Sequence, residues 1–223
     1  MGFASTANKT HIEEQYSKLI QLIKDTFGEN SDRAKALLKL YEDYEERVKE
    51  APASGKLNFH NAYEGGYLDH VHNVIECAKY MKRLYEKMNG LIDFTDEELI
   101  FVAIHHDLGK LGTLDEPYYV VQDSDWHRQN KLEVFKINDD RQYMRTNDLS
   151  IFILQQYGVT MTQTEYLAIK LTDGLYDDSN KSYLQQYGAG PFPMRTNLHK
   201  IMHWADHMAA SAEGDVIRAK YVR

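Results

Sequence analysis

Three separate segments of this chain carry residue types that bind divalent metals. His70 follows residues 64–69, His106 and Asp107 are adjacent, and Asp206 lies near the end of the chain. Imidazole nitrogens with carboxylate oxygens suit borderline or hard divalent ions, and the lack of thiolates argues against a closed structural zinc site. Each segment reads as helix, so three helices could present these four side chains to one point. The sequence therefore predicts a divalent metal site.

Further residues near these segments could take part in chemistry at such a site. Lys110 lies one turn beyond Asp107 on the same face, so its ammonium could steady a phosphate unless it is simply a solvated lysine. His60 precedes His70 by ten residues and could contact the phosphate or donate a proton. We expect Lys110, Asp107 and His60 to be catalytic. We expect Lys110, His60 and Arg128 to contact the substrate, although loop packing explains Arg128 equally well.

Other histidines offer competing interpretations. His199, His203 and His207 recur every four residues and form one helical stripe, which could itself bind a metal or lie on the surface without a function. His105 and His72 fall on different helix faces from their ligand neighbours. We therefore expect both of them to pack against the rest of the protein.

The hydrophobic periodicity that must position these residues is helical along most of the chain. Apolar residues at three- and four-residue spacing mark the predicted helices, and Thr95–Glu98 and Thr162–Glu165 have the pattern of capping boxes. The expected helices cover residues 10–27, 30–48, 66–85, 96–107, 148–157, 165–172 and 197–219. Periodicity fails from about 109 to 147, where Pro117 and several aromatic residues indicate an ordered loop or a short hairpin.

These elements predict an all-α fold without strand–helix alternation. The expected architecture is a helical bundle with an N-terminal helical pair and one long aromatic loop or short hairpin insertion. Residues 1–56 form the N-terminal helical arm, packed on a core of residues 57–223. The oligomeric state is left open, and the N-terminal pair could pack against a second copy.

Composition limits the classes of partner and compartment. The chain has 223 residues, 43% of them hydrophobic, which is enough for one substantial core. Its net charge of −8 argues against binding long nucleic acid through a basic surface, and small anionic substrates fit better. Cys77 is the single cysteine, so no internal disulfide forms. No run approaches the roughly 18 apolar residues of a membrane span. We expect a cytoplasmic protein that binds no membrane.

The three segments, taken in order, resemble those of the HD-domain metal-dependent phosphohydrolases. Residues 65–70 resemble the first ligand segment of that family, residues 106–110 its central His-Asp segment and residues 204–206 its last. The resemblance covers roughly residues 57–215. It implies an HD-domain core in which the metal ligands are His70, His106, Asp107 and Asp206.

The chain also departs from the two-metal members of this family. Their extra histidines would fall near residues 145–148 and 170–174, where this sequence has none. Asp148 or Asp173 could still serve a second ion. We expect one divalent ion per chain, drawn from Mn, Mg, Co, Ni, Zn or Fe. A single ion disfavours the di-iron oxygenase branch of the family.

The expected function is metal-dependent hydrolysis of a small phosphorylated metabolite, with a nucleotide as the expected substrate, through metal-activated water. The same metal core would serve a monophosphate, a triphosphate or a cyclic phosphodiester. An HD-type di-iron oxygenase and a non-catalytic nucleotide-binding module remain the alternatives. Two iron atoms per chain would favour the first, and tight binding without turnover the second.

Overall fold

The protein is mostly helical, as the sequence predicts. The computed structural model describes residues 9–185 and 194–221. The longer helices are α1 (Lys9–Phe27), α2 (Asp32–Asp43), α4 (Gly66–Lys87), α5 (Asp96–His105), α7 (Thr146–Gln156), α8 (Gln163–Lys170) and α10 (Leu198–Tyr221). The shorter ones are α3 (Glu45–Glu50), α6 (Asp125–Asn130), α9 (Lys181–Leu184), η1 (Leu108–Leu111), η2 (Gly174–Tyr176) and η3 (Asp178–Asn180). No described helix combines the length and apolar character needed to cross a membrane.

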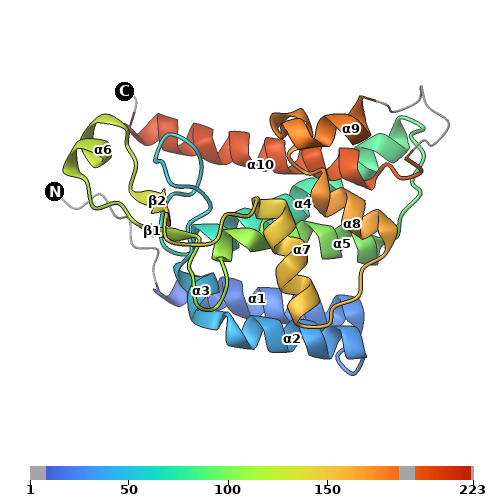
Figure 1. The fold of residues 1–223 in the computed structure, drawn as a ribbon. Coiled ribbons are helices and arrows are strands. Elements are labelled where there is room, and N and C mark those ends of the chain that lie inside the picture. Colours follow the sequence, from blue (N-terminus) through green and yellow to red (C-terminus); the bar gives the residue numbers. More distant parts are fainter. Residues whose placement is uncertain (1–8, 186–193, 222–223) are drawn as a thin grey trace.

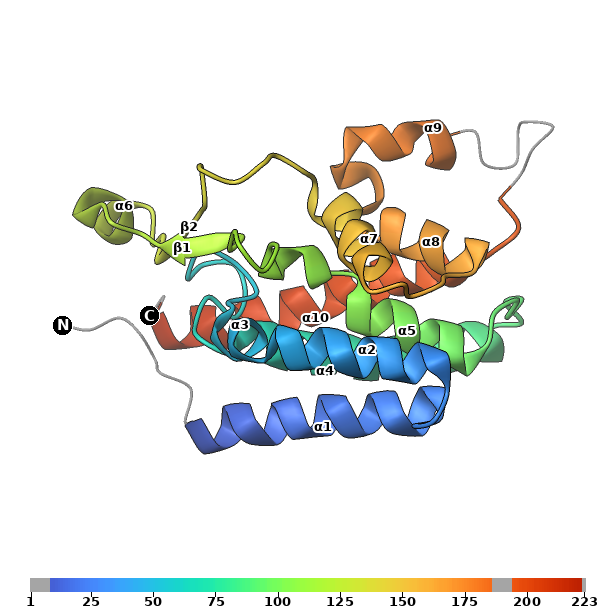
Figure 2. The same ribbon diagram turned by 60° about the horizontal axis from the view of Figure 1, so that its bottom comes forward.

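The helices pack in layers around α4 and α10. These two helices make the most extensive contact between elements in the described part of the chain. Helix α1 lies outermost on one side, against α2 and α4, whereas α7, α8 and α9 lie on the opposite side (Figure 2). Helix α5 contacts α4 and α8 and so lies between the two outer layers. The two long helices are therefore placed to carry a buried site.

One hydrophobic core joins the N-terminal helices to the rest of the molecule. Its fully buried members include Leu19 of α1, Leu37 of α2, Val71 of α4, Phe101 of α5 and Ile201 of α10. Burying each large apolar side chain contributes roughly 1.5–3 kcal/mol. The N-terminal pair is thus packed against the same core that holds the predicted metal-binding segments.

Helix starts follow the capping residues in the sequence. The Thr95 side chain accepts from the backbone N–H of Glu98, whose carboxylate in turn accepts from the backbone N–H of Thr95. Thr162 and Glu165 form the same reciprocal pair at the start of α8. Both predicted capping boxes are confirmed. The predicted second helix is wrong in one respect, because it is interrupted at Tyr44, where α2 gives way to α3.

The aperiodic segment after η1 contains the two strands of the described structure. Strands β1 (Tyr119–Val121) and β2 (Phe135–Ile137) pair antiparallel, and helix α6 lies between them in the chain. The three elements lie together at one end of the molecule (Figure 1).

Backbone hydrogen bonds tie this hairpin to the loop that precedes α4. The Val134 N–H donates to Gly55 O at 2.9 Å, and the Leu57 N–H donates to Leu132 O at 2.8 Å. A Cβ at Gly55 would lie 2.6 Å from Phe135 O, so this close approach requires glycine. The hairpin is therefore attached to the loop that carries His60.

Candidate metal centre

The structure brings the four predicted metal ligands together. His70 lies in the second turn of α4, Asp206 lies on α10, and His106 and Asp107 follow α5. The Nε2 atom of His70 lies 3.5 Å from Asp107 Oδ2 and 3.2 Å from Asp206 Oδ1. The Nε2 atom of His106 lies 3.5 Å and 3.7 Å from the same two oxygens. Four side chains from distant parts of the sequence thus converge on one buried point.

The expectation that His106 and Asp107 lie inside a helix is wrong. Helix α5 ends at His105, and Asp107 immediately precedes the short 3₁₀-helix η1. Just after this turn, Gly109 packs directly against the backbone carbonyl of Thr146, at the start of α7, where a Cβ would not fit. The turn leaves Asp107 close to both imidazoles.

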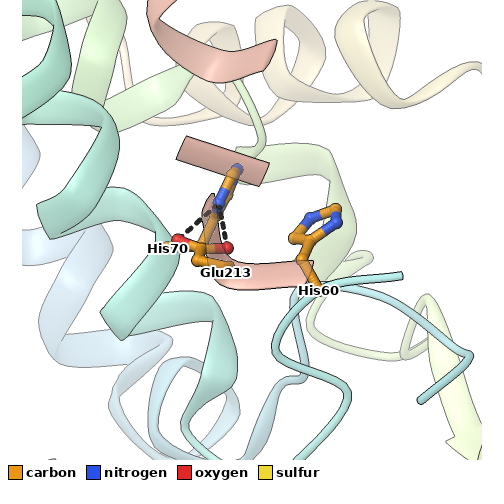
Figure 3. A group of neighbouring side chains, drawn as sticks. All are labelled: His60, His70 and Glu213. Carbon is orange, nitrogen blue, oxygen red and sulfur yellow. Dashed lines mark hydrogen bonds and ion pairs between the residues drawn. The ribbon is translucent and has the colours of Figure 1, made fainter. Parts of the chain in front are cut away.

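Hydrogen bonds at Nδ1 leave the Nε2 atoms of both histidines facing the cluster. His106 Nδ1 donates to the carbonyl of Ala103 at 2.9 Å, and His70 Nδ1 lies 3.0 Å from Glu213 Oε2 (Figure 3). The Nε2 atoms are buried and have no hydrogen-bond partner among the described residues. An imidazole protonated at Nδ1 has its free lone pair at Nε2, which is the arrangement of a metal-binding histidine.

Glu213 is a member of the cluster that the sequence interpretation missed. Its carboxylate is buried against His70, and it also accepts a hydrogen bond of 2.7 Å from the Asn73 side chain. Helical spacing could have found it. Glu213 follows Asp206 by seven residues, which is about two turns of α10 and places both on the same face.

The charges in the cluster favour a cation. Burial alone would lower the pKa of His70, but the nearby carboxylates of Asp107, Asp206 and Glu213 raise it well above its usual value. Burial would conversely raise the pKa of Asp107, but Lys110 and the histidines hold it well below its usual value. Asp107 and Asp206 thus stay ionised at neutral pH and draw positive charge toward the imidazoles.

Lys110 lies at the edge of the cluster. Its Nζ is 2.6 Å from Asp107 Oδ2, three residues earlier in the chain. Burial would lower the pKa of this lysine, but Asp107 outweighs burial and raises it above the usual value. Lys110 also lines a pocket of about 200 Å³ together with Asp107 and Asp206. Its ammonium is therefore a fixed positive charge at the mouth of the site.

His60 lies beside the predicted ligands. Its ring centroid is 4.7 Å from that of His70 (Figure 3), and its Nε2 is buried with no hydrogen-bond partner among the described residues. Burial, with Lys110 adding, lowers the pKa of His60 to about 3, so this imidazole is neutral at pH 7. The Ser54 hydroxyl donates to the carbonyl of His60 at 2.6 Å and steadies the loop.

Two sets of side chains have the spacing of a metal site. Ligand atoms of His70, His106 and Asp206 lie within 4.8 Å of one another, and so do those of His60, His70 and Glu213. In the second set, His70 Nδ1 and Glu213 Oε2 are already hydrogen-bonded to each other, so these two atoms are not free to bind a metal. We therefore favour the first set, completed by Asp107.

Arg128 does not join the cluster. It lies on α6, where its guanidinium donates to the carbonyl of Gln122 and to the Asp125 carboxylate. Its side chain instead lines a second, larger pocket of about 680 Å³, which shares Lys110 with the metal-site pocket. Arg128, which was predicted to contact the substrate, thus lines the neighbouring pocket and not the metal-site pocket.

The carboxylates considered for a second ion differ in position. Asp148 forms an ion pair of 2.7 Å with Lys170. Asp173 lines the same small pocket as Asp107, and burial together with the charges of Asp107 and Asp206 raises its pKa. Asp173 therefore faces the site, whereas Asp148 is engaged elsewhere.

The other histidines that the sequence offered as competing ligands belong to neither metal-spaced set of the described residues. His203 Nδ1 donates to the carbonyl of Thr172 at 2.7 Å. His105 donates to the carbonyl of Phe101 and is fully buried, and His72 lies 2.9 Å from the carbonyl of Gln15. The stripe formed by His203, its neighbour His207 and the buried His199 contains no metal-spaced group in the part of the chain that the structure describes.

The donor set fits a divalent cation. Two buried, unpartnered imidazole nitrogens face two carboxylates, and a third carboxylate orients one of the imidazoles. Two nitrogens and two oxygens suit Mn, Fe, Co, Ni or Zn, and leave positions open on an ion that accepts six ligands. Comparisons with family models, curated proteins and solved structures found no match for this chain.

Proposed function

We propose that this chain is a metal-dependent phosphohydrolase that acts on a small phosphorylated metabolite, with a nucleotide as the favoured substrate. The observation that carries the proposal is the convergence of the buried His70 and His106 nitrogens on Asp107 and Asp206, beside the ammonium of Lys110. The resemblance of the segments carrying these residues to HD-domain phosphohydrolases supports it.

In this proposal His70, His106, Asp107 and Asp206 hold one divalent ion per chain. When bound, such an ion lowers the pKa of a coordinated water toward neutrality and offsets charge on phosphate oxygens. Glu213 keeps the His70 proton on Nδ1, so that Nε2 remains free for the metal.

Two further residues would act on the phosphate directly. Lys110 carries a fixed positive charge at the pocket and would stabilise a phosphate oxygen as negative charge develops. His60 is neutral at pH 7, so it would donate a hydrogen bond through its N–H instead of giving up a proton as an imidazolium. Lys110, and not His60, would thus supply the positive charge that faces the phosphate.

The test is phosphate release from nucleoside mono-, di- and triphosphates with Mg, Mn, Co or Ni, combined with metal analysis of the protein. Asp107→Ala removes a ligand and should abolish both metal retention and turnover. The control is Asp115→Ala, because Asp115 is an exposed carboxylate in a nearby loop and should leave both unchanged. Full activity in Asp107→Ala would refute the assignment. Tight nucleotide binding without turnover would favour a binding module, and two iron atoms per chain an oxygenase.

A further inference from the structure

The pocket of about 680 Å³ adjoins the metal cluster at Lys110, which lines both cavities. Its walls come from the end of α3, the loop before α4, η1 and the hairpin β1–β2. Most of the lining is apolar or aromatic, including Tyr63, Tyr119, Val121 and Phe135. This volume lies in the range of small-molecule sites, and aromatic walls suit a planar ring.

Each of the three cations that line this pocket has a partner within the protein. Arg47 donates to the backbone carbonyls of Leu111 and Thr113 at 2.7 Å and 3.2 Å. Arg128 donates to the carbonyl of Gln122 and to the Asp125 carboxylate. Lys110 pairs with Asp107, one of the proposed metal ligands, and lines both pockets, so its position at the junction makes it the cation best placed for a phosphate at the metal site.

Two carboxylates make the rest of the pocket unfavourable for extra phosphates. Glu50 and Glu64 line it and are exposed, and neither forms an ion pair with a described residue. A chain of three phosphates would bring several negative charges toward them, and both arginines of the lining are held by other groups of the protein. The same carboxylates can accept hydrogen bonds from the hydroxyl or amino groups of an uncharged ligand.

We propose that this pocket binds the nucleoside of a nucleoside monophosphate, with its single phosphate at Lys110 and the metal cluster, and that the carboxylates of Glu50 and Glu64 disfavour triphosphates. The inference rests on the proposed phosphohydrolase function and narrows it. The hairpin and Phe135 form one wall, Tyr63 and the loop before α4 form the other, and Glu50 and Glu64 accept from the ligand's polar groups.

The experiment compares kcat/KM for a nucleoside 5′-monophosphate, the matching triphosphate and methyl phosphate, with the protein loaded with Mn. We expect the monophosphate to exceed the triphosphate by at least about tenfold. We expect it to exceed methyl phosphate by about a hundredfold, because methyl phosphate leaves the nucleoside pocket empty.

Charge variants test the cause of this preference. The double variant Glu50→Gln and Glu64→Gln should reduce the ratio of kcat/KM for the monophosphate to kcat/KM for the triphosphate by roughly threefold. The double variant Glu50→Lys and Glu64→Lys should reduce it by roughly tenfold. Both side chains are exposed, so the variants should fold. Glu46→Lys is the matched control, since Glu46 is exposed one turn earlier on α3 and does not line the pocket.

Each outcome separates the two proposals. Turnover of the triphosphate as fast as the monophosphate, or of methyl phosphate as fast as either, would overturn the pocket assignment and leave the hydrolase intact. A ratio that changes equally in Glu46→Lys and in the pocket variants would also overturn it. If none of the three substrates releases phosphate, both proposals are overturned.

Discussion

At the scale of single residues, the site depends on how each imidazole is oriented. His106 is oriented by the carbonyl of Ala103, a backbone group of α5, which ends at the residue before His106, whereas His70 depends on a carboxylate from α10. The orientation of His70 is therefore coupled to the packing of α10 on α4. This makes Glu213 the residue whose loss should weaken the site without removing a ligand.

We predict that Glu213→Gln reduces metal affinity about 10- to 100-fold, the usual cost of losing an outer partner of a metal-binding histidine. The amide keeps the size of the side chain but loses the charge that fixes the His70 proton on Nδ1. Equilibrium dialysis with Co or Mn measures the change. Glu86→Gln, at an exposed position on α4, is the control. An unchanged dissociation constant in Glu213→Gln would show that Glu213 does not support the site.

Lys110→Met should retain the metal and lose about a hundredfold in kcat, because the methionine side chain keeps the bulk of lysine without its charge. Metal content and steady-state kinetics are measured on the same preparation. Lys35→Met, at an exposed position on α2, should alter neither. Unchanged kinetics in Lys110→Met would mean that the ammonium has no role in turnover.

At the scale of elements, sequence patterns predicted the helices well where capping residues were explicit. The capping boxes at Thr95 and Thr162 are confirmed, and the three ligand segments meet as expected. The end of α5 before Asp107 and the 3₁₀-helix after it were missed, because the close approach of Gly109 to the backbone of α7 is a tertiary contact that local periodicity does not encode. Glu213 was missed because a single glutamate on a helix has no distinctive pattern of its own.

This tight turn gives a prediction for Gly109. A Cβ at that position would collide with the Thr146 carbonyl, and the Gly109 N–H donates to the Ser150 hydroxyl at 2.8 Å. Gly109→Ala should therefore lower the free energy of unfolding by about 2–3 kcal/mol. Urea denaturation measures the change in the free energy of unfolding.

A second glycine separates steric collision from backbone strain. Gly28 has φ 73°, but a Cβ there would meet no atom within 4 Å, so Gly28→Ala should cost only about 1 kcal/mol. If Gly109→Ala is no more destabilising than Gly28→Ala, then the close approach between η1 and α7 does not control stability.

At the scale of the whole molecule, histidines with opposite pKa shifts share one core. The carboxylates raise the pKa of His70 and His106, whereas burial lowers the pKa of His105 to about 3 and that of His199 to about 4. The first pair gains stability from protonation and the second pair loses it. The pH dependence of the free energy of unfolding therefore combines opposing contributions. A variant that removes one histidine is needed to isolate its contribution.

His105→Phe isolates the contribution of one buried imidazole. His105 packs 4.5 Å from the Phe101 ring, in a space that another aromatic ring can occupy. In the native protein its pKa is about 3, against an ordinary value of 6.5, so between these pH values the unfolded chain binds a proton that the native protein does not. The stability contributed by neutral His105 is therefore complete above pH 6.5 and falls as the pH decreases toward 3.

Between pH 7 and pH 5 the free energy of unfolding of the wild-type protein should fall by about 2 kcal/mol more than that of His105→Phe. Denaturation with a chelator present, at several pH values, measures the difference in slope without a contribution from metal release. The absolute stability of the variant does not matter, because the lost hydrogen bond to the Phe101 carbonyl shifts both ends of its curve equally. Parallel curves for the two proteins would mean that His105 takes up its proton in the folded state, and that this part of the core admits water.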